Sequence, residues 1–311
     1  MPALDFTKLK TYPLASRRSK VSHDAFARVG RKGLSFKDFY DSLPRILAAQ
    51  NLRTVVRAIL EARRKNKPVL WMFGAHVLKV GLNPLIIQLL RRKVVTAIAV
   101  NGAGIIHDFE LAYMGSTSED VASALADGSF GMAQETANMI NRAIKDGAKK
   151  NLGLGQAVGA MITKSRLPYR KLSLLATCHE LGIPMTVHVA IGTDIIHQQA
   201  VADGAAIGKT SLADFRRLVG VVSQLGDGGV AGNFGSAVIL PEVFLKAVSI
   251  SRNLGHPVKD LTTFDFDMIR HYRPGENVLK RPTLLGGTAV HITGHHELLI
   301  PMLAQAIIEE L

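Results

Sequence analysis

The chain has 311 residues, of which 47% are hydrophobic and 20% charged, so it is not a disordered chain and can fold as one large α/β domain or two modest ones. Its single cysteine, Cys178, excludes an intramolecular disulfide framework and zinc sites of the Cys₄ or Cys₂His₂ type. No apolar run reaches the ~18 residues of a membrane-spanning helix, and the N-terminus has no signal-peptide core, so we expect a cytoplasmic protein without a membrane partner.

The net charge of +13 is concentrated in the N-terminal part of the chain. Residues 1–67 hold 16 Lys/Arg and five Asp/Glu, which leaves the rest nearly neutral. No aromatic-rich motif accompanies this charge, so we interpret it as a solvated face or a surface that covers a neighbouring subunit. Nucleic-acid binding, an acidic partner and a mitochondrial presequence are the less favoured alternatives. Residues 1–36 show no clear period and are predicted to form a basic arm.

From residue 37 onward, helical stretches and short apolar runs follow one another. Two helices are predicted within 37–66. Apolar or glycine-rich runs that predict strands and their ends follow at 69–74, 96–104, 184–192, 228–237, 260–266 and 287–294. Helical stretches are predicted at 134–150, 170–182, 212–226, 241–255 and 296–311. This alternation is typical of βαβ units. It predicts one α/β domain over 37–311, with a doubly wound, mostly parallel sheet, helices on both faces and an N-terminal helical extension.

Ligands of such sheets bind beyond the carboxyl ends of the strands, so the polar and glycine-rich segments that end predicted strands are the candidate sites. These segments are Gly74–His76, Asn101–Asp108, Gly192–His197, Gly232–Ser236, Thr262–Asp267 with its continuation to Lys280, and His291–Glu297. The Gly102-Ala103-Gly104 turn is similar to the dinucleotide fingerprint, but His107 stands where its third glycine belongs. A glycine turn between a strand and a helix is also common without any ligand.

The order and content of these segments resemble deoxyhypusine synthase over roughly residues 65–311. The matching segments are Asn101–Phe109, Ile191–Asp194, Phe234–Ala237, Thr262 with Asp267, and Arg273–Lys280. The resemblance implies a Rossmann-like fold, a homotetramer and an NAD cofactor. The family oxidises spermidine with NAD and passes the aminobutyl group, through an enzyme-lysine imine, to a lysine of a translation-factor precursor.

Carried onto this sequence, the resemblance implies a role for each matched position. The matched residues that would bind NAD are Gly102, Ala103, Gly104, Gly235, Thr262 and Asp267. Apart from the resemblance, cofactor contacts are also predicted for Asp108, Ser236, His295 and His296. Lys280 would form the imine, and Asp194 and Glu276 would face the cationic amine. A buried polyamine needs such carboxylates to offset the desolvation of its ammonium groups.

The sequence also departs from the family. The family's tryptophan before the catalytic lysine has no counterpart, because the only tryptophan, Trp71, lies on the first predicted strand. The family's catalytic histidine is missing from the stretch 238–242, so we predict that His197, oriented by Asp194, serves as the general base. We therefore expect a divergent, NAD-dependent aminoalkyl transferase. Its acceptor is a protein lysine or, as in homospermidine formation, a small amine.

Two other classes of function stay open. His188, His197, His291, His295 and His296 lie near predicted strand ends, and histidine is a common metal ligand. A metal-dependent hydrolase is therefore one alternative. However, the run from His291 to Glu297 lacks the His-Glu-x-x-His pattern of one helical face, so no metal ligand is predicted. The other alternative is a non-catalytic NAD-binding protein with the same fold.

Overall fold

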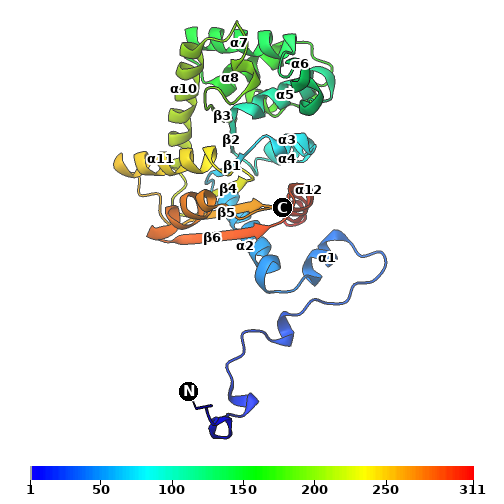
Figure 1. The fold of residues 1–311 in the computed structure, drawn as a ribbon, viewed down its shortest axis with the longest axis vertical. Helices are drawn as coiled ribbons and strands as arrows, with labels where there is room; N and C mark the ends of the chain where they lie inside the picture. Colours follow the sequence, from blue (N-terminus) through cyan, green and yellow to red (C-terminus); the bar gives the residue numbers. More distant parts are fainter. Residues whose placement is uncertain (1) are drawn as a thin grey trace. The chain divides into compact units, whose positions relative to one another are not determined.

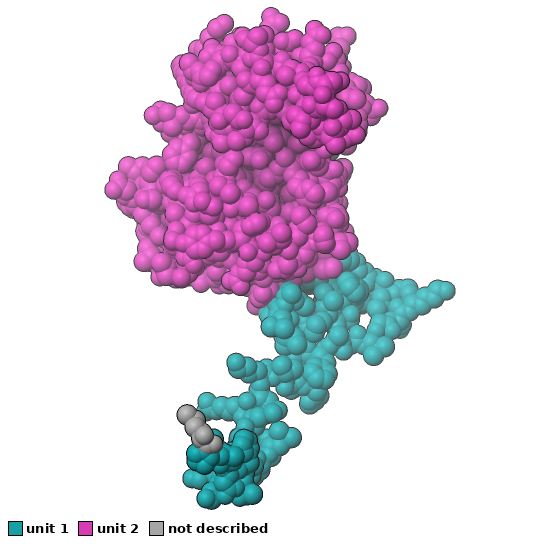
Figure 2. All heavy atoms as spheres, in the orientation of Figure 1, with its two compact units in different colours: residues 1–50 teal, residues 51–311 magenta. Residues whose placement is uncertain are grey.

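The computed structural model describes residues 2–311 and divides the chain into two compact units, one up to Gln50 and one from Asn51 to Leu311 (Figure 2). The first unit contains three short 3₁₀ turns (Phe6–Lys8, Leu14–Ser16 and His23–Ala25), α1 (Phe36–Ser42) and the start of α2 (Leu47–Arg64). Ser35 caps α1 by accepting the N–H of Asp38. The predicted boundary at residue 36 thus falls inside the first unit, where α1 begins.

The second unit is built on a six-stranded sheet in which every neighbouring pair is parallel (Figure 1). The strands are β1 (Val69–Phe73), β2 (Ala97–Asn101), β3 (Met185–His188), β4 (Val230–Phe234), β5 (Leu261–Asp267) and β6 (Gly287–Thr293). Their spatial order is β3-β2-β1-β4-β5-β6, which is the order of a doubly wound, dinucleotide-binding sheet. The predicted Rossmann-like α/β fold is therefore confirmed.

Helices connect the strands and cover the sheet. They are α3 (His76–Lys79), α4 (Asn83–Arg91), α5 (Gly102–Met114), α6 (Val121–Asp127), α7 (Gln134–Lys149), α8 (Leu154–Lys164), α9 (Leu174–Leu181), α10 (Gly204–Val222), α11 (Ile239–Asn253) and α12 (His296–Glu309). In Figure 1, α10 and α11 lie on one side of the sheet, and α3, α4 and α12 on the other. A short π-helix, Pro274–Lys280, lies between β5 and β6. Within residues 2–311, no helix is long and apolar enough to cross a membrane.

Aromatic side chains fill the centre of the sheet. The ring of Trp71 on β1 lies 4.7 Å from that of Phe234 on β4, and Phe234 in turn contacts Phe264 on β5 at 5.3 Å. Trp71, Phe234 and Phe264 are fully buried. Gly232 leaves room for them, since a Cβ at this position would stand 2.1 Å from the Phe264 ring. The glycine-rich sequence of β4 is thus a packing requirement as well as a turn signal.

Replacing Gly232 with alanine should destabilise the fold by about 2 kcal/mol, because the added methyl group overpacks the centre of the sheet. Denaturant unfolding followed by circular dichroism measures this change. Gly220→Ala on α10 is the matched control, since a Cβ there meets no atom within 4 Å. That change should stabilise the helix by ~0.5–1 kcal/mol. Equal effects of the two changes would contradict the packing argument.

Strand β3 forms one edge of the sheet, and side chains of α10 satisfy its outward backbone groups. Asp214 Oδ2 accepts the N–H of Val187 at 2.9 Å and that of Gly155, at the start of α8, at 2.8 Å. Ser211 Oγ donates to the carbonyl of Val187 at 3.0 Å and accepts the N–H of Val189 at 3.2 Å. This covering prevents another strand from pairing with β3.

Candidate active site

The strand order reverses between β1 and β4, and ligands of this fold bind outside the carboxyl ends of the strands at such a point. A glycine follows each of these strands, Gly74 after β1 and Gly235 after β4. The N–H of Gly74 after β1 donates to the carbonyl of Phe234 at 3.3 Å, and the N–H of Gly235 after β4 donates to that of Phe266 at 3.1 Å. A Cβ on Gly74 would stand 3.5 Å from the carbonyl oxygen of Gly235. The two turns therefore meet at the reversal point, and their backbones are partly exposed.

His296 reaches this point although it follows the distant strand β6. Its Nε2 lies 3.0 Å from the carbonyl oxygen of Phe266, and its ring lies 5.8 Å from that of His76. Gly235 has a φ of 67° and no room for a side chain, since a Cβ would stand 2.4 Å from His296 Cε1. Of the other predicted cofactor residues nearby, Ser236 is buried and accepts the N–H of Leu240 at the start of α11. His295 is exposed beside Glu297.

Asp194 and His197 lie together at the end of β2. The carboxylate of Asp194 covers Gly102, where a Cβ would stand 1.9 Å from Oδ2. His197 Nε2 lies 3.9 Å from Asp194 Oδ2, and the two side chains are only 6% and 4% exposed. Neither of these atoms has a hydrogen-bond partner within residues 2–311. Burial raises the pKa of Asp194 to about 6 and lowers the pKa of His197. The two side chains therefore lie together, but no hydrogen bond joins them, and the orientation of His197 by Asp194 stays a prediction.

Two predicted cofactor residues lie away from the carboxyl edge. Asp108 is fully buried and caps α9, where it accepts hydrogen bonds from the N–H groups of Leu174 and Leu175, the Ser173 hydroxyl and the Asn83 amide. Burial raises its pKa to about 6 in spite of these bonds. Thr262 lies at the opposite, amino end of β5, where its N–H donates to Gly229. Asp108 therefore has a structural role at the N-terminus of α9. Thr262 lies roughly 16 Å from Asp267 along β5, at the other end of the strand.

A pocket of ≈ 750 Å³ lies beside β6 and the Pro274–Lys280 helix. Lys280, Glu276, His271 and His291 all line it. Lys280 is exposed to 67% and lies one helical turn from Glu276, with its Nζ 3.4 Å from Glu276 Oε1. Arg281 shares the same carboxylate, with its Nε 3.7 Å from Oε2. The structure thus brings the predicted lysine and one of the two predicted amine-binding carboxylates into one pocket.

His291 enters this pocket from β6 and is held by a buried carboxylate. Its Nδ1 lies 3.1 Å from Asp265 Oδ2, and Asp265 Oδ1 accepts the Asn233 amide at 2.7 Å. Its Nε2 lies 3.0 Å from the Thr293 hydroxyl. Burial raises the pKa of Asp265, while the hydrogen bond from Asn233 and the charge of His291 oppose that rise. This pair was not predicted from the sequence. Asp265 and His291 are direct neighbours on the adjacent strands β5 and β6, so the register of these two strands is what brings them together.

The three histidines that are close in the C-terminal sequence do not gather at one point. His291 faces Asp265, His296 faces the carbonyl of Phe266, and His295 is exposed. In the part of the chain that the structure describes, no group of three His, Cys, Asp or Glu side chains is placed to hold a metal ion.

A dinucleotide requires two kinds of group at the point where the strand order reverses. In this strand order the pyrophosphate belongs at the turn after the first strand, and a carboxylate near the end of the second strand binds a ribose hydroxyl. The Gly74 turn and the free Oδ2 of Asp194 beside Gly102 match these two positions. The same carboxylate repels a phosphate from the N-terminus of α5. This edge therefore offers two of the positions that a dinucleotide needs, and the one beside Gly102 suits a ribose and not a pyrophosphate.

Comparisons with known proteins identify the fold and no family. No protein-family model and no curated sequence match the chain. The structure of AgrE in complex with ornithine and NAD+ matches 86% of this chain with a TM-score of 0.53 and 14% identity. An LOR/SDH-type protein from Methanococcus maripaludis S2 matches 84% of this chain and 70% of its own, with a TM-score of 0.50 and 14% identity.

A protein from Entamoeba histolytica that is assigned as a deoxyhypusine synthase matches 89% of this chain and 94% of its own, with a TM-score of 0.49 and 11% identity. This chain spans only 34% of the AgrE chain and 31% of that of the cyanobacterial arginine dihydrolase ArgZ. At these identities the proteins are distant relatives in fold.

Proposed function

We propose that the protein is an NAD-dependent enzyme, similar to deoxyhypusine synthase, that acts on a polyamine such as spermidine through an imine on Lys280. The observation that carries this proposal is the presence of Lys280, Glu276 and His291 in one pocket, beside β6 and the Pro274–Lys280 helix. These three groups are a nucleophile, an anion for the substrate and a proton acceptor. They are the side chains that imine chemistry on a cationic amine requires.

NAD, when bound, supplies the acceptor for the hydride that leaves the amine carbon. The Gly74–His76 turn is assigned to its pyrophosphate and the free oxygen of Asp194 to a ribose hydroxyl. Gly235 and His296 would then contact the end of the cofactor that lies nearer to β5. The AgrE complex, which holds NAD+ together with ornithine, supports a dinucleotide and a cationic amine on the same fold.

Glu276 links substrate binding to the activation of Lys280. An imine forms only from an uncharged amine, and the Nζ of Lys280 forms an ion pair with Glu276. A polyamine ammonium that takes over Glu276 leaves Lys280 without its counter-ion and next to the cation Arg281. The amine of Lys280 is then free of the ion pair and can attack the substrate carbon. The arriving substrate therefore prepares the nucleophile.

His291 is the proton acceptor in this proposal, in place of His197. Asp265 fixes the tautomer and the ring orientation through Nδ1, as carboxylates do beside catalytic histidines. The Nε2 atom, on the Thr293 hydroxyl, is then free to exchange that contact for the substrate amine. The pair Asp194–His197 keeps a role in binding the cofactor.

His291→Gln should lower turnover about 10²-fold, the contribution of one general base, and leave NAD binding unchanged. Steady-state kinetics and fluorescence titration with NAD measure the two effects. His256→Gln is the control, because His256 is exposed and does not line the pocket. A large loss of turnover in His197→Gln, together with normal turnover in His291→Gln, would instead identify His197 of the Asp194–His197 pair as the general base.

The proposal as a whole is tested by the first half of the reaction, which needs no acceptor. The protein is incubated with spermidine, with and without NAD, and 1,3-diaminopropane is measured by mass spectrometry. NAD-dependent release is the expected result. Adding a small diamine or a protein lysine afterwards distinguishes the two acceptor classes. NAD binding without release would instead favour the non-catalytic NAD-binding protein. The homotetramer stays a prediction, which light scattering checks.

A further inference from the structure

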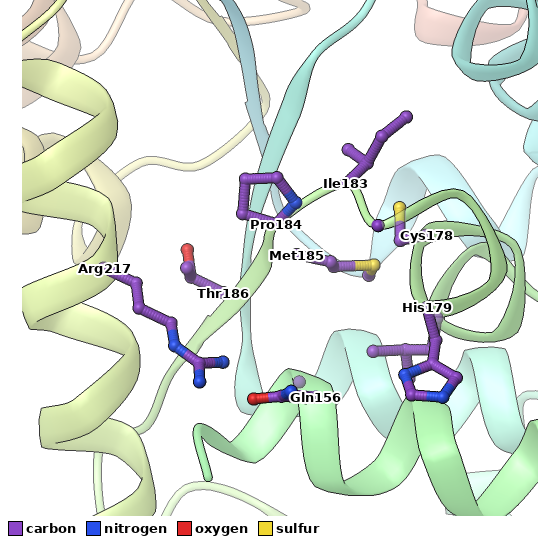
Figure 3. A pocket seen from close by; sticks show the side chains of 11 residues that line it. Gln156, Cys178, His179, Ile183, Pro184, Met185, Thr186 and Arg217 are labelled. Atoms are coloured by element: carbon purple, nitrogen blue, oxygen red, sulfur yellow. The ribbon is translucent and has the colours of Figure 1, made fainter.

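A second pocket, of ≈ 300 Å³, lies at the amino end of β3, at the opposite edge of the sheet from Lys280 (Figure 3). It is enclosed by α8, α9, α10 and the segment that leads into β3. Leu175, Cys178, Ile183 and Met185 form its apolar wall, and Gln156, His179, Thr186 and Arg217 its polar wall. This volume is at the lower end of the range for small-molecule sites, ~300–1,000 Å³.

Arg217 gives the pocket a positive charge that the protein balances weakly. Its side chain is 40% exposed, and within residues 2–311 its one ion pair is with Asp214, at 4.0 Å. The other oxygen of Asp214 is occupied by two backbone N–H groups. No Asp or Glu lines the pocket. In Figure 3 the guanidinium group of Arg217 points toward Gln156 across the cavity. Its planar group of N–H donors suits a carboxylate.

Two further polar groups lie at the same wall. Gln156 Oε1 is buried and has no hydrogen-bond partner within the described chain. The carbonyl of Pro184 accepts the N–H of Ile98 on β2. Because the backbone groups of successive residues in a strand point to opposite sides, the N–H and carbonyl of Met185 point away from β2. Asp214 takes the outward N–H of Val187, two residues farther along, and does not bond to that of Met185. A bound molecule can therefore accept from Met185 and donate to Gln156, and unpaired buried groups of this kind are costly.

We propose that this pocket binds a short α-hydroxy carboxylic acid with an apolar side chain. The carboxylate accepts hydrogen bonds from Arg217 and from the N–H of Met185. The neighbouring hydroxyl donates to Gln156 Oε1, and the apolar chain packs on Leu175 and Ile183. An α-amino acid is disfavoured, because its ammonium group would lie beside the cation Arg217, and the nearest carboxylate, that of Asp214, is outside the lining and already pairs with Arg217.

Calorimetric titration of the full chain, without NAD or spermidine, tests this site independently of the proposed catalytic activity. The probe is 2-hydroxy-4-methylpentanoate. It should bind more tightly than 4-methylpentanoate, which lacks the hydroxyl, and than leucine, in which an ammonium group replaces it. Absence of binding by the hydroxy acid, or tighter binding by leucine, would overturn the proposal.

Three variants locate the binding. Arg217→Met should weaken binding of the hydroxy acid at least about tenfold, whereas Arg216→Met, the exposed neighbour outside the pocket, should not. Gln156→Leu should reduce the affinity for the hydroxy acid to that for 4-methylpentanoate and leave the latter unchanged. If Arg217→Met does not fold, Arg217→Lys keeps the charge but loses the planar donors, and it should still weaken binding. Equal affinity in wild type and the Arg217 variant that folds would refute the assignment.

Discussion

Lys280→Arg should lower the NAD-dependent release of 1,3-diaminopropane by roughly 10³-fold or more, because an arginine stays protonated and cannot form the imine. The change keeps the positive charge next to Glu276, so substrate binding and folding should be nearly unchanged. Turnover is measured by mass spectrometry of the released diamine. Borohydride reduction during turnover should trap an adduct on Lys280 in the wild type and none in the variant.

The chain offers a matched control for this change. Lys246 on α11 forms the same type of ion pair, with Glu242 four residues earlier, and lies outside the pocket. Lys246→Arg should retain full turnover and the full adduct. A trapped adduct of normal yield in Lys280→Arg would show that another amine carries the imine, and the assignment of Lys280 would then be wrong.

The fold follows from the sequence because it depends on local patterns. Apolar runs such as Val69–Phe73 and Val230–Phe234 are buried along their whole length, as strands of a sheet covered on both faces must be. The order of the strands is not local information. The Gly102–Gly104 turn has the glycine spacing of a phosphate-binding turn, yet it follows the strand next to the first, and Asp194 already occupies the N-terminus of its helix.

The candidate site shows the same limit. Asp194 and His197 are near neighbours in the sequence, so their pairing could be predicted, and they do lie together. Asp265 and His291 are 26 residues apart and meet only through the register of β5 and β6. Asp108 follows the glycine turn like a cofactor ligand, but the N-terminus of α9 packs onto it from 65 residues away. Contacts of this kind come from tertiary packing, which a single sequence does not display.

Asp214→Asn should stabilise the protein at about pH 8 and leave its stability nearly unchanged at about pH 4. Burial raises the pKa of Asp214 to about 7, whereas the carboxyl titrates near ~3.9 in the unfolded chain. As the pH rises between these values, the unfolded chain loses the proton first. The stability that Asp214 contributes is therefore fully present below about pH 4 and is lost as the pH rises through about 7.

Asparagine removes this cost because it can keep the structural role without the charge. Its amide oxygen can accept the N–H groups of Gly155 and Val187 in place of Asp214 Oδ2. The gain at high pH is at most about 4 kcal/mol, and the lost attraction to Arg217 reduces it. Denaturant unfolding at both pH values measures the difference, and Asp146→Asn, at an exposed position on α7, is the control that should show none.

Asp214→Ala separates the hydrogen bonds from the charge. It leaves both N–H groups without an acceptor at the edge of β3, and should cost about 2–4 kcal/mol at either pH. Opposite effects of the alanine and asparagine variants at about pH 8 are therefore expected, and equal losses would show that the ionised carboxylate stabilises the edge. In that case α10 would hold β3 through a charge, and Arg217 would be its partner instead of a free donor for a ligand.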